Sequence, residues 1–187
     1  MKELKKALTI VLTLAMIFAM AACDGEGGDS DGENGGIAGK NISIMTPYLG
    51  SVTTNQMVEY LEGNLKELGA EVTVVNTDND FGALASRIED VVSAGTDAIV
   101  LVSADPNQVA NQLKEAFDAD IPVFGCDSGF IEGMQINATS DNYQMGELIV
   151  KSLFDDLMGG KGTVIALTHR PHPGVVKRCE AFADLIE

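Results

Sequence analysis

The sequence predicts an α/β fold built on a doubly wound parallel sheet. From residue 41 onward, short β-branched runs alternate with longer segments whose apolar residues recur at helical spacing. The short runs are continuously apolar, which is typical of strands that are covered on both faces of a parallel sheet. Because short loops join these segments, right-handed crossovers would arrange them as one layered sheet.

Each element follows from a local pattern. The expected strands cover residues 42–45, 72–75, 98–102, 121–124, 134–137 and 163–167. Helices are expected from apolar stripes within residues 57–68, 81–92, 109–117 and 145–157. Residues typical of helix ends support them, namely the possible capping box of Thr53 and Gln56, Asp105 before Pro106, Asp141, and the glycines Gly69 and Gly159.

The first 40 residues have the features of an export signal and a tether. Residues 1–22 begin with "MKELKK" and continue with a long apolar run, as in a secretory signal peptide. The letters "MAAC" resemble a bacterial lipobox, which implies cleavage before Cys23 and a lipid on its thiol. A transmembrane anchor is the alternative, although the run is short for a span of about 20 residues. Residues 23–40 are rich in Gly, Asp, Glu, Ser and Asn, so we expect a flexible acidic tether and an exported protein that Cys23 anchors to the outer face of the cell membrane.

Composition argues against several classes of function. The net charge is −16 and no basic patch appears, so the chain would repel nucleic acid. It has no G-x-S-x-G elbow and no dinucleotide-binding glycine motif, so neither an enzyme nor a cofactor site is predicted. "GGKGT" (residues 159–163) precedes a predicted strand instead of following one, which indicates a turn and not a phosphate loop.

Two pairs of residues leave simple alternatives open. His169 and His172 lie close in sequence, but no third ligand has suitable spacing, and we predict no metal site. Cys126 and Cys179 either form a disulfide or are two small buried side chains.

The predicted sheet indicates where a ligand would bind. In doubly wound sheets, ligands bind outside the carboxyl ends of the strands. Asp127 follows the strand at 121–124, within "FGCDSGF", and a carboxylate there makes strong hydrogen bonds to hydroxyl donors. The alternative is a turn carboxylate that bonds its own backbone.

The order of these motifs resembles a known family. The lipobox, the acidic tether, the βα series, "IPVFGCDSG" and "ATSDNYQMG" together resemble bacterial type I periplasmic binding proteins of the ribose- and galactose-binding group. The resemblance extends from about Asn41 to Glu187. It implies two α/β lobes with a ligand between them, with residues 41–140 as the N-terminal lobe and residues 141–187 as the incomplete start of a second α/β lobe.

The resemblance also implies a function. These proteins are the substrate-binding components of ABC importers, so it implies a sugar or similar small polar solute as ligand and permease subunits as partners. The alternative is a ligand-sensing receptor that feeds a histidine kinase or a chemoreceptor.

The resemblance implies roles for individual residues around the ligand. Asp127 matches an aspartate that accepts hydrogen bonds from sugar hydroxyls, but Ser128 stands where many members have an arginine. Arg170 could replace that donor, whereas Arg178 fits a packing or capping role and Val176 occupies a ligand-contacting position. The full expected set of ligand-binding residues is Tyr48, Ser51, Thr54, Asn55, Asp127, Ser128, Phe130, His169 and Arg170. Tyr48 and Phe130 could instead be packing residues, and the residues from 51 to 55 could instead cap the first helix.

Overall fold

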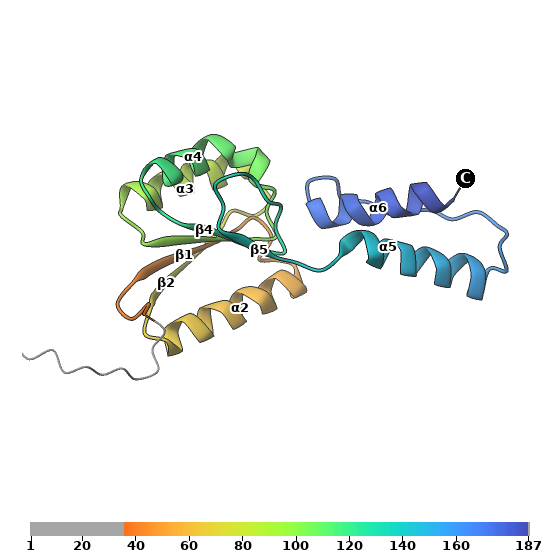
Figure 1. Ribbon diagram of the computed structural model, residues 1–187, viewed down its shortest axis with the longest axis horizontal. Coiled ribbons are helices and arrows are strands. Elements are labelled where there is room, and N and C mark those ends of the chain that lie inside the picture. The colour runs from red at the N-terminus through yellow and green to blue at the C-terminus, as the bar shows by residue number, and fades with distance from the viewer. Residues whose placement is uncertain (1–35, 187) are drawn as a thin grey trace, which may run out of the picture. The chain divides into compact units, whose positions relative to one another are not determined.

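The sheet is parallel throughout, as the sequence predicted. The computed structural model describes residues 36–186, so the predicted signal peptide, Cys23 and most of the tether lie outside the described residues. Five strands form the sheet in the order β2-β1-β3-β4-β5, and every neighbouring pair is parallel (Figure 1). The strands are β1 (Asn41–Thr46), β2 (Glu71–Asn76), β3 (Ala98–Val102), β4 (Val123–Cys126) and β5 (Ile136–Ala138).

Helices cover the sheet from both sides. Helix α2 (Val52–Glu67) lies on one face, and α3 (Phe81–Ser93) and α4 (Ala110–Asp118) lie on the other (Figure 1). The larger core lies under α3 and α4, and its fully buried members include Met45, Leu84, Ile88, Ile99, Leu101, Leu113 and Val123. A smaller core under α2 centres on Ile44, Val58 and Val102. This double cover explains why the strand sequences are continuously apolar.

The strand order places a switch point between β1 and β3. The chain moves from β1 to β2 in one direction, and then crosses β1 to form β3, β4 and β5 on the other side. The loops that follow β1 and β3 therefore diverge, which opens a crevice at the carboxyl edge of the sheet. Between Gly36 and Ile186, no helix combines the length and the apolar character that a membrane crossing requires.

The helix ends agree with most of the sequence signals. Asp105 accepts a hydrogen bond from the Asn107 amide at 3.0 Å, and Pro106 begins a short 3-10 turn (Pro106–Val109) before α4. The predicted capping box of Thr53 and Gln56 is wrong, because α2 already begins at Val52. Ser51 is its N-cap residue, and the Ser51 hydroxyl bonds that of Thr53 instead of a backbone amide.

Two helices follow the sheet. Helix α5 (Asn142–Lys151) continues into a π-helical turn (Ser152–Leu157), and α6 (Pro173–Leu185) packs against α5. Asp141 caps α5 by accepting from the Gln144 amide at 2.9 Å. The two helices approach closely at Gly146, where an added Cβ would lie 2.6 Å from the Arg178 carbonyl oxygen.

The strand predicted at residues 163–167 is wrong. Among the described residues, 36–186, no strand pairs with this segment, and Ile165 and Leu167 are 87% and 92% exposed. An isolated segment cannot form a strand, because strand stability comes from the hydrogen bonds and side-chain contacts of a neighbour. Within residues 141–186, the expected start of a second α/β lobe therefore consists of helices joined by a segment without helix or strand.

Candidate ligand-binding site

A polar cavity of about 450 Å³ opens at the carboxyl edge of the sheet. Its walls come from the loops after β1, β2 and β4 and from the segment that leads into α6. Its lining includes Tyr48, Ser51, Thr54, Asp78, Asn79, Asp127, His169, His172 and Arg178. The switch point of the sheet thus carries hydroxyl, carboxylate, imidazole and guanidinium groups, which suit a small polar ligand.

Asp127 is held by side chains from distant parts of the chain. It follows β4 directly with φ 48°, a backbone conformation that Asp and Asn adopt more readily than most residues. Thr139 Oγ1 donates to Asp127 Oδ1 at 3.0 Å, and His172 Nε2 lies 3.4 Å from Asp127 Oδ2. These contacts favour an inward-facing carboxylate over a turn carboxylate bonded to its own backbone.

The surroundings keep Asp127 ionised. The pKa of Asp127 is lowered, first by the hydrogen bond with His172 and then by the hydrogen bond from Thr139 and the charge of Arg178. Burial acts in the opposite direction on this pKa but does not outweigh the others. The carboxylate therefore remains a charged acceptor at neutral pH.

His172 links Asp127 to the start of α6. Its Nδ1 accepts a hydrogen bond from the Gly174 amide at 3.2 Å, as an N-cap residue does. In the neutral imidazole the proton is then on Nε2, which faces Asp127. One side chain thus caps a helix and contacts the candidate ligand residue.

Tyr48 supplies an aromatic surface to the same cavity. Its ring stacks on His172 at a centroid distance of 6.3 Å and 28°, and it meets His169 edge-on at 5.5 Å. The pKa of Tyr48 is raised, mainly by burial and also by the charge of Asp105, so the hydroxyl stays protonated. That hydroxyl lies 3.3 Å from His169 Nε2.

Some predicted residues have structural partners instead. The Ser128 hydroxyl is buried and donates to the Ala104 carbonyl oxygen at 2.7 Å. The Thr54 hydroxyl donates to Ser103 Oγ at 3.2 Å, and Asn55 bonds Glu59 along α2. The sequence alone could not reveal these partners, because only the Asn55 bond joins residues that are close in sequence.

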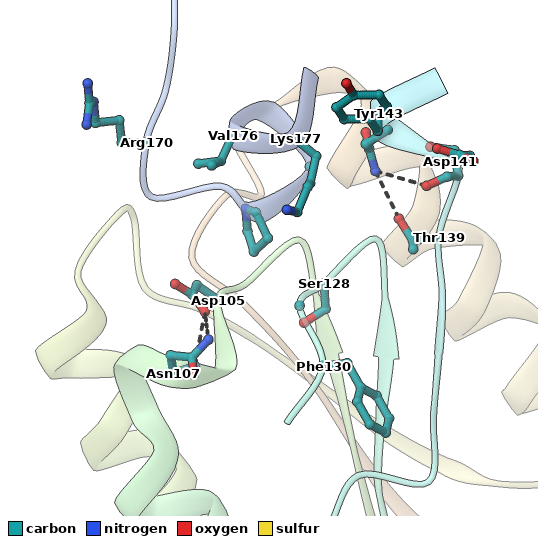
Figure 2. Close-up of a pocket in the computed structure, with 15 residues that line it drawn as sticks. Asp105, Asn107, Ser128, Phe130, Thr139, Asp141, Tyr143, Arg170, Val176 and Lys177 are labelled. Atoms are coloured by element: carbon teal, nitrogen blue, oxygen red, sulfur yellow. Dashed lines mark hydrogen bonds between the residues drawn. The ribbon is translucent and has the colours of Figure 1, made fainter. Parts of the chain in front are cut away.

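A second cavity of about 540 Å³ adjoins the first. Figure 2 shows Asp105, Ser128, Lys177 and Phe130 among the residues that line it. Arg170 also lines this cavity, whereas Arg178 lines the cavity of Asp127. Arg170 therefore does not lie in the cavity of Asp127, where it was expected to replace the arginine that many members have beside the aspartate. Arg178 is the better candidate for a hydrogen-bond donor to a ligand there.

A third cavity, of about 530 Å³, lies between α2 and the sheet. Leu61, Val100 and Phe124 are among its mainly apolar lining residues. Such a lining cannot satisfy the many hydrogen bonds of a polyhydroxyl compound. The polar cavity around Asp127 is therefore the better candidate for a soluble, polar ligand.

The two described cysteines are both free. Cys126 Sγ lies 3.9 Å from Met57 Sδ, and Cys179 Sγ donates to Thr168 Oγ1 at 3.2 Å. The pKa of Cys126 is raised by burial and by the charge of Asp127. Of the two alternatives from the sequence, the structure favours separate, partly buried thiols.

The sequence reasoning missed three residues of the site. The sequence pattern gives His172 no role beyond a rejected metal site, indicates packing or capping for Arg178, and assigns no role to Thr139. The pair His172-Pro173 is a recognisable helix start, but its contact with Asp127 depends on the tertiary structure.

Comparison with known proteins shows the family of the chain. The family model described as "Periplasmic binding protein domain" matches residues 42–187. The chain belongs to this family. Among its relatives in the family, the ribose import binding protein RbsB of Bacillus subtilis is 26% identical over 166 residues, which cover 87% of this chain and 53% of the relative. The fructose import binding protein FruE of Bifidobacterium longum is 30% identical over 132 residues, which cover 68% of this chain and 38% of the relative.

Solved structures show the same fold. An ABC transporter solute binding protein from Agrobacterium vitis with bound allitol has a TM-score of 0.74 and 27% identity over 80% of this chain and 51% of that chain. A 5-methylthioribose-binding protein from Thermotoga lettingae has a TM-score of 0.71 and 20% identity over 78% of this chain and 46% of that one, and it supports the fold alone. The chain spans about half or less of the length of the curated relatives that it matches. The relatives are named as binding proteins of import systems and not as enzymes.

Proposed function

We propose that this chain is the solute-binding component of an ABC importer and that it binds a sugar or a related small polyhydroxyl compound around Asp127. The observation that carries the proposal is an ionised carboxylate beside the ring of Tyr48, in a polar cavity at the switch point of a parallel sheet. The relatives named for ribose and fructose, and the neighbour with bound allitol, support polyhydroxyl compounds as the ligand class.

The chemistry of the cavity suits hydroxyl groups. A carboxylate accepts about four hydrogen bonds, and Asp127 has one polar contact to each of its oxygens. A solute with several hydroxyls could donate to the remaining positions and place an apolar ring face on Tyr48. Arg178 and the hydroxyl of Ser51 would complement it as donors.

Import also requires a location and a moving part. A lipid on Cys23 would hold the protein at the outer face of the membrane, close to its permease. The chain would cross between lobes at residues 138–142, so that residues 41–140 and the region from residue 141 onward close on the solute. Solute binding would favour the closed form, and the permease would recognise that form.

Titration calorimetry on the purified chain tests the proposal. The chain contains no tryptophan, so calorimetry is preferable to tryptophan fluorescence. D-ribose, D-xylose, D-fructose and allitol form the first panel. At least one should bind, and Asp127→Asn should weaken it about 10- to 100-fold, because a hydrogen bond to a charged acceptor contributes about 1.5–3 kcal/mol.

The variant and its control are matched. Asparagine is preferred to alanine at position 127 because it tolerates the positive φ. Asp90→Asn removes an exposed carboxylate on α3 that pairs with Arg87, and it should leave affinity unchanged. The proposal is refuted if no compound of the panel binds, or if both variants bind as the unmodified chain does.

A further inference from the structure

His172 makes the contacts that a polyhydroxyl ligand would make. Its ring stacks on Tyr48, and its Nε2 faces the carboxylate of Asp127. An aromatic ring under a flat face and a carboxylate opposite a polar hydrogen are the two features that a bound sugar ring would use. The side chain of His172 is only 13% exposed and lines the cavity, so it occupies these two contacts of Asp127 and Tyr48 itself.

The contact also divides the crevice. Asp127 and His172 line the first cavity, whereas their direct neighbours Ser128 and Pro173 line the second. At Gly129 the β4 loop approaches α6 so closely that an added Cβ would lie 3.3 Å from Pro173 Cγ. The start of α6 therefore lies against the β4 loop and forms a wall between the two cavities.

The loop before His172 is loosely held, whereas the start of α6 after it packs against α5. Residues 163–171 contain no helix or strand, and His169 and Arg170 are exposed. Segments with few buried contacts open at a low free-energy cost. His172 lies at the junction between this exposed loop and the packed helix α6, so its side chain can leave Asp127 with less loss of packing than a movement of α6 would cause.

Resting on the proposed function, we propose that His172 is an internal occupant of the ligand position, and that solute binding requires its displacement from Asp127 and Tyr48. The contact between His172 and Asp127 acts as a latch: it holds the start of α6 against the β4 loop in the absence of solute, and a bound solute replaces it as the link between the two regions that close on the solute. His172 thereby lowers the affinity for solute, because its contacts must be exchanged for those of the ligand.

Hydrogen exchange tests the latch without any solute. Amides of residues 168–176 in the purified chain are followed by mass spectrometry. Asp127→Asn should accelerate their exchange about fivefold, since the charged partner of His172 is lost. Asp90→Asn should not change it. Equal exchange in the Asp127→Asn variant and the unmodified chain would overturn the latch.

Calorimetry with D-ribose, D-xylose, D-fructose and allitol tests the competition. The variant His172→Ser keeps an N-cap oxygen for α6 but cannot reach Asp127. It should lower the Kd about tenfold, because one polar contact and one ring contact no longer have to be broken. The control Asp90→Asn, on the exposed side of α3, should leave the Kd unchanged.

The possible outcomes separate the two proposals. An unchanged or higher Kd for His172→Ser, with clear binding to the unmodified chain, refutes the latch and leaves the proposed function in place. If neither protein binds any of the four compounds, both proposals fall. Thermal unfolding of His172→Ser should stay cooperative, which shows that a changed Kd does not reflect a loss of α6.

Discussion

Gly129→Ala should destabilise the junction between the β4 loop and α6. An added Cβ would lie 2.7 Å from Pro106 Cδ and 3.3 Å from Pro173 Cγ. Carbon atoms normally approach to about 3.5–4.0 Å, so the first contact is short by about 1 Å. Both neighbours are proline rings at helix starts and cannot rotate away, so one of the two helix starts must shift. Overpacking of this kind costs about 1–3 kcal/mol.

Chemical denaturation measures this cost directly. The urea midpoint of Gly129→Ala should fall with little change in the slope, as it does when stability changes but the surface exposed on unfolding does not. Gly63→Ala is the matched control, because it lies within α2 and its added Cβ would meet nothing within 4 Å. It should stabilise the chain by about 0.5–1 kcal/mol through helix propensity. The steric argument is refuted if Gly129→Ala is as stable as the unmodified chain.

Two further predictions concern Asp127 and Cys23. Because the pKa of Asp127 is lowered in the folded protein, its stabilising contribution is present above the unfolded pKa and is lost as the pH falls through the folded value. The difference in unfolding free energy between the unmodified chain and Asp127→Asn should therefore shrink from about pH 4 downward, and urea midpoints across that range would show a constant difference if the reasoning is wrong. Cys23→Ser should abolish lipid attachment, so expression in a bacterial host with a labelled fatty acid should label the unmodified protein alone. Equal labelling of both would exclude Cys23 as the site.

The fold could be predicted because its signals are local. Continuous apolar runs such as residues 98–102 specify strands that are buried on both faces, and the structure has a strand over those residues. The place of Asp127 could be predicted for a related reason, since a polar residue directly after a buried strand must lie at the carboxyl edge of the sheet. The prediction of a strand at residues 163–167 was wrong, because an apolar composition does not by itself provide a neighbouring strand with which the segment could pair.

The partners of the site could not be predicted, because they depend on tertiary contacts. His172 is 45 positions from Asp127 in sequence, and only the packing of α6 against α5 and the β4 loop brings the two together. The buried acceptor of Ser128 is likewise the Ala104 carbonyl oxygen, 24 positions away. A sequence pattern can indicate which edge of a sheet is polar, but it does not show which of those polar groups are already paired.

The role of Asp127 illustrates why pairing matters for function. Its carboxylate joins three segments: β4 carries it, Thr139 contacts it from the stretch before α5, and His172 contacts it from the start of α6. A buried carboxylate whose acceptor positions are all used would only stabilise the fold. One with no hydrogen bond would destabilise the fold, because nothing would offset the cost of removing it from water. Asp127 lies between these limits, because each oxygen has one polar contact and room for another. A solute hydroxyl can therefore add to the contact with Thr139, while on the His172 side it must compete with a ring that is stacked on Tyr48. Asp127, the residue proposed to recognise the solute, is therefore also the residue that contacts the start of α6 through His172.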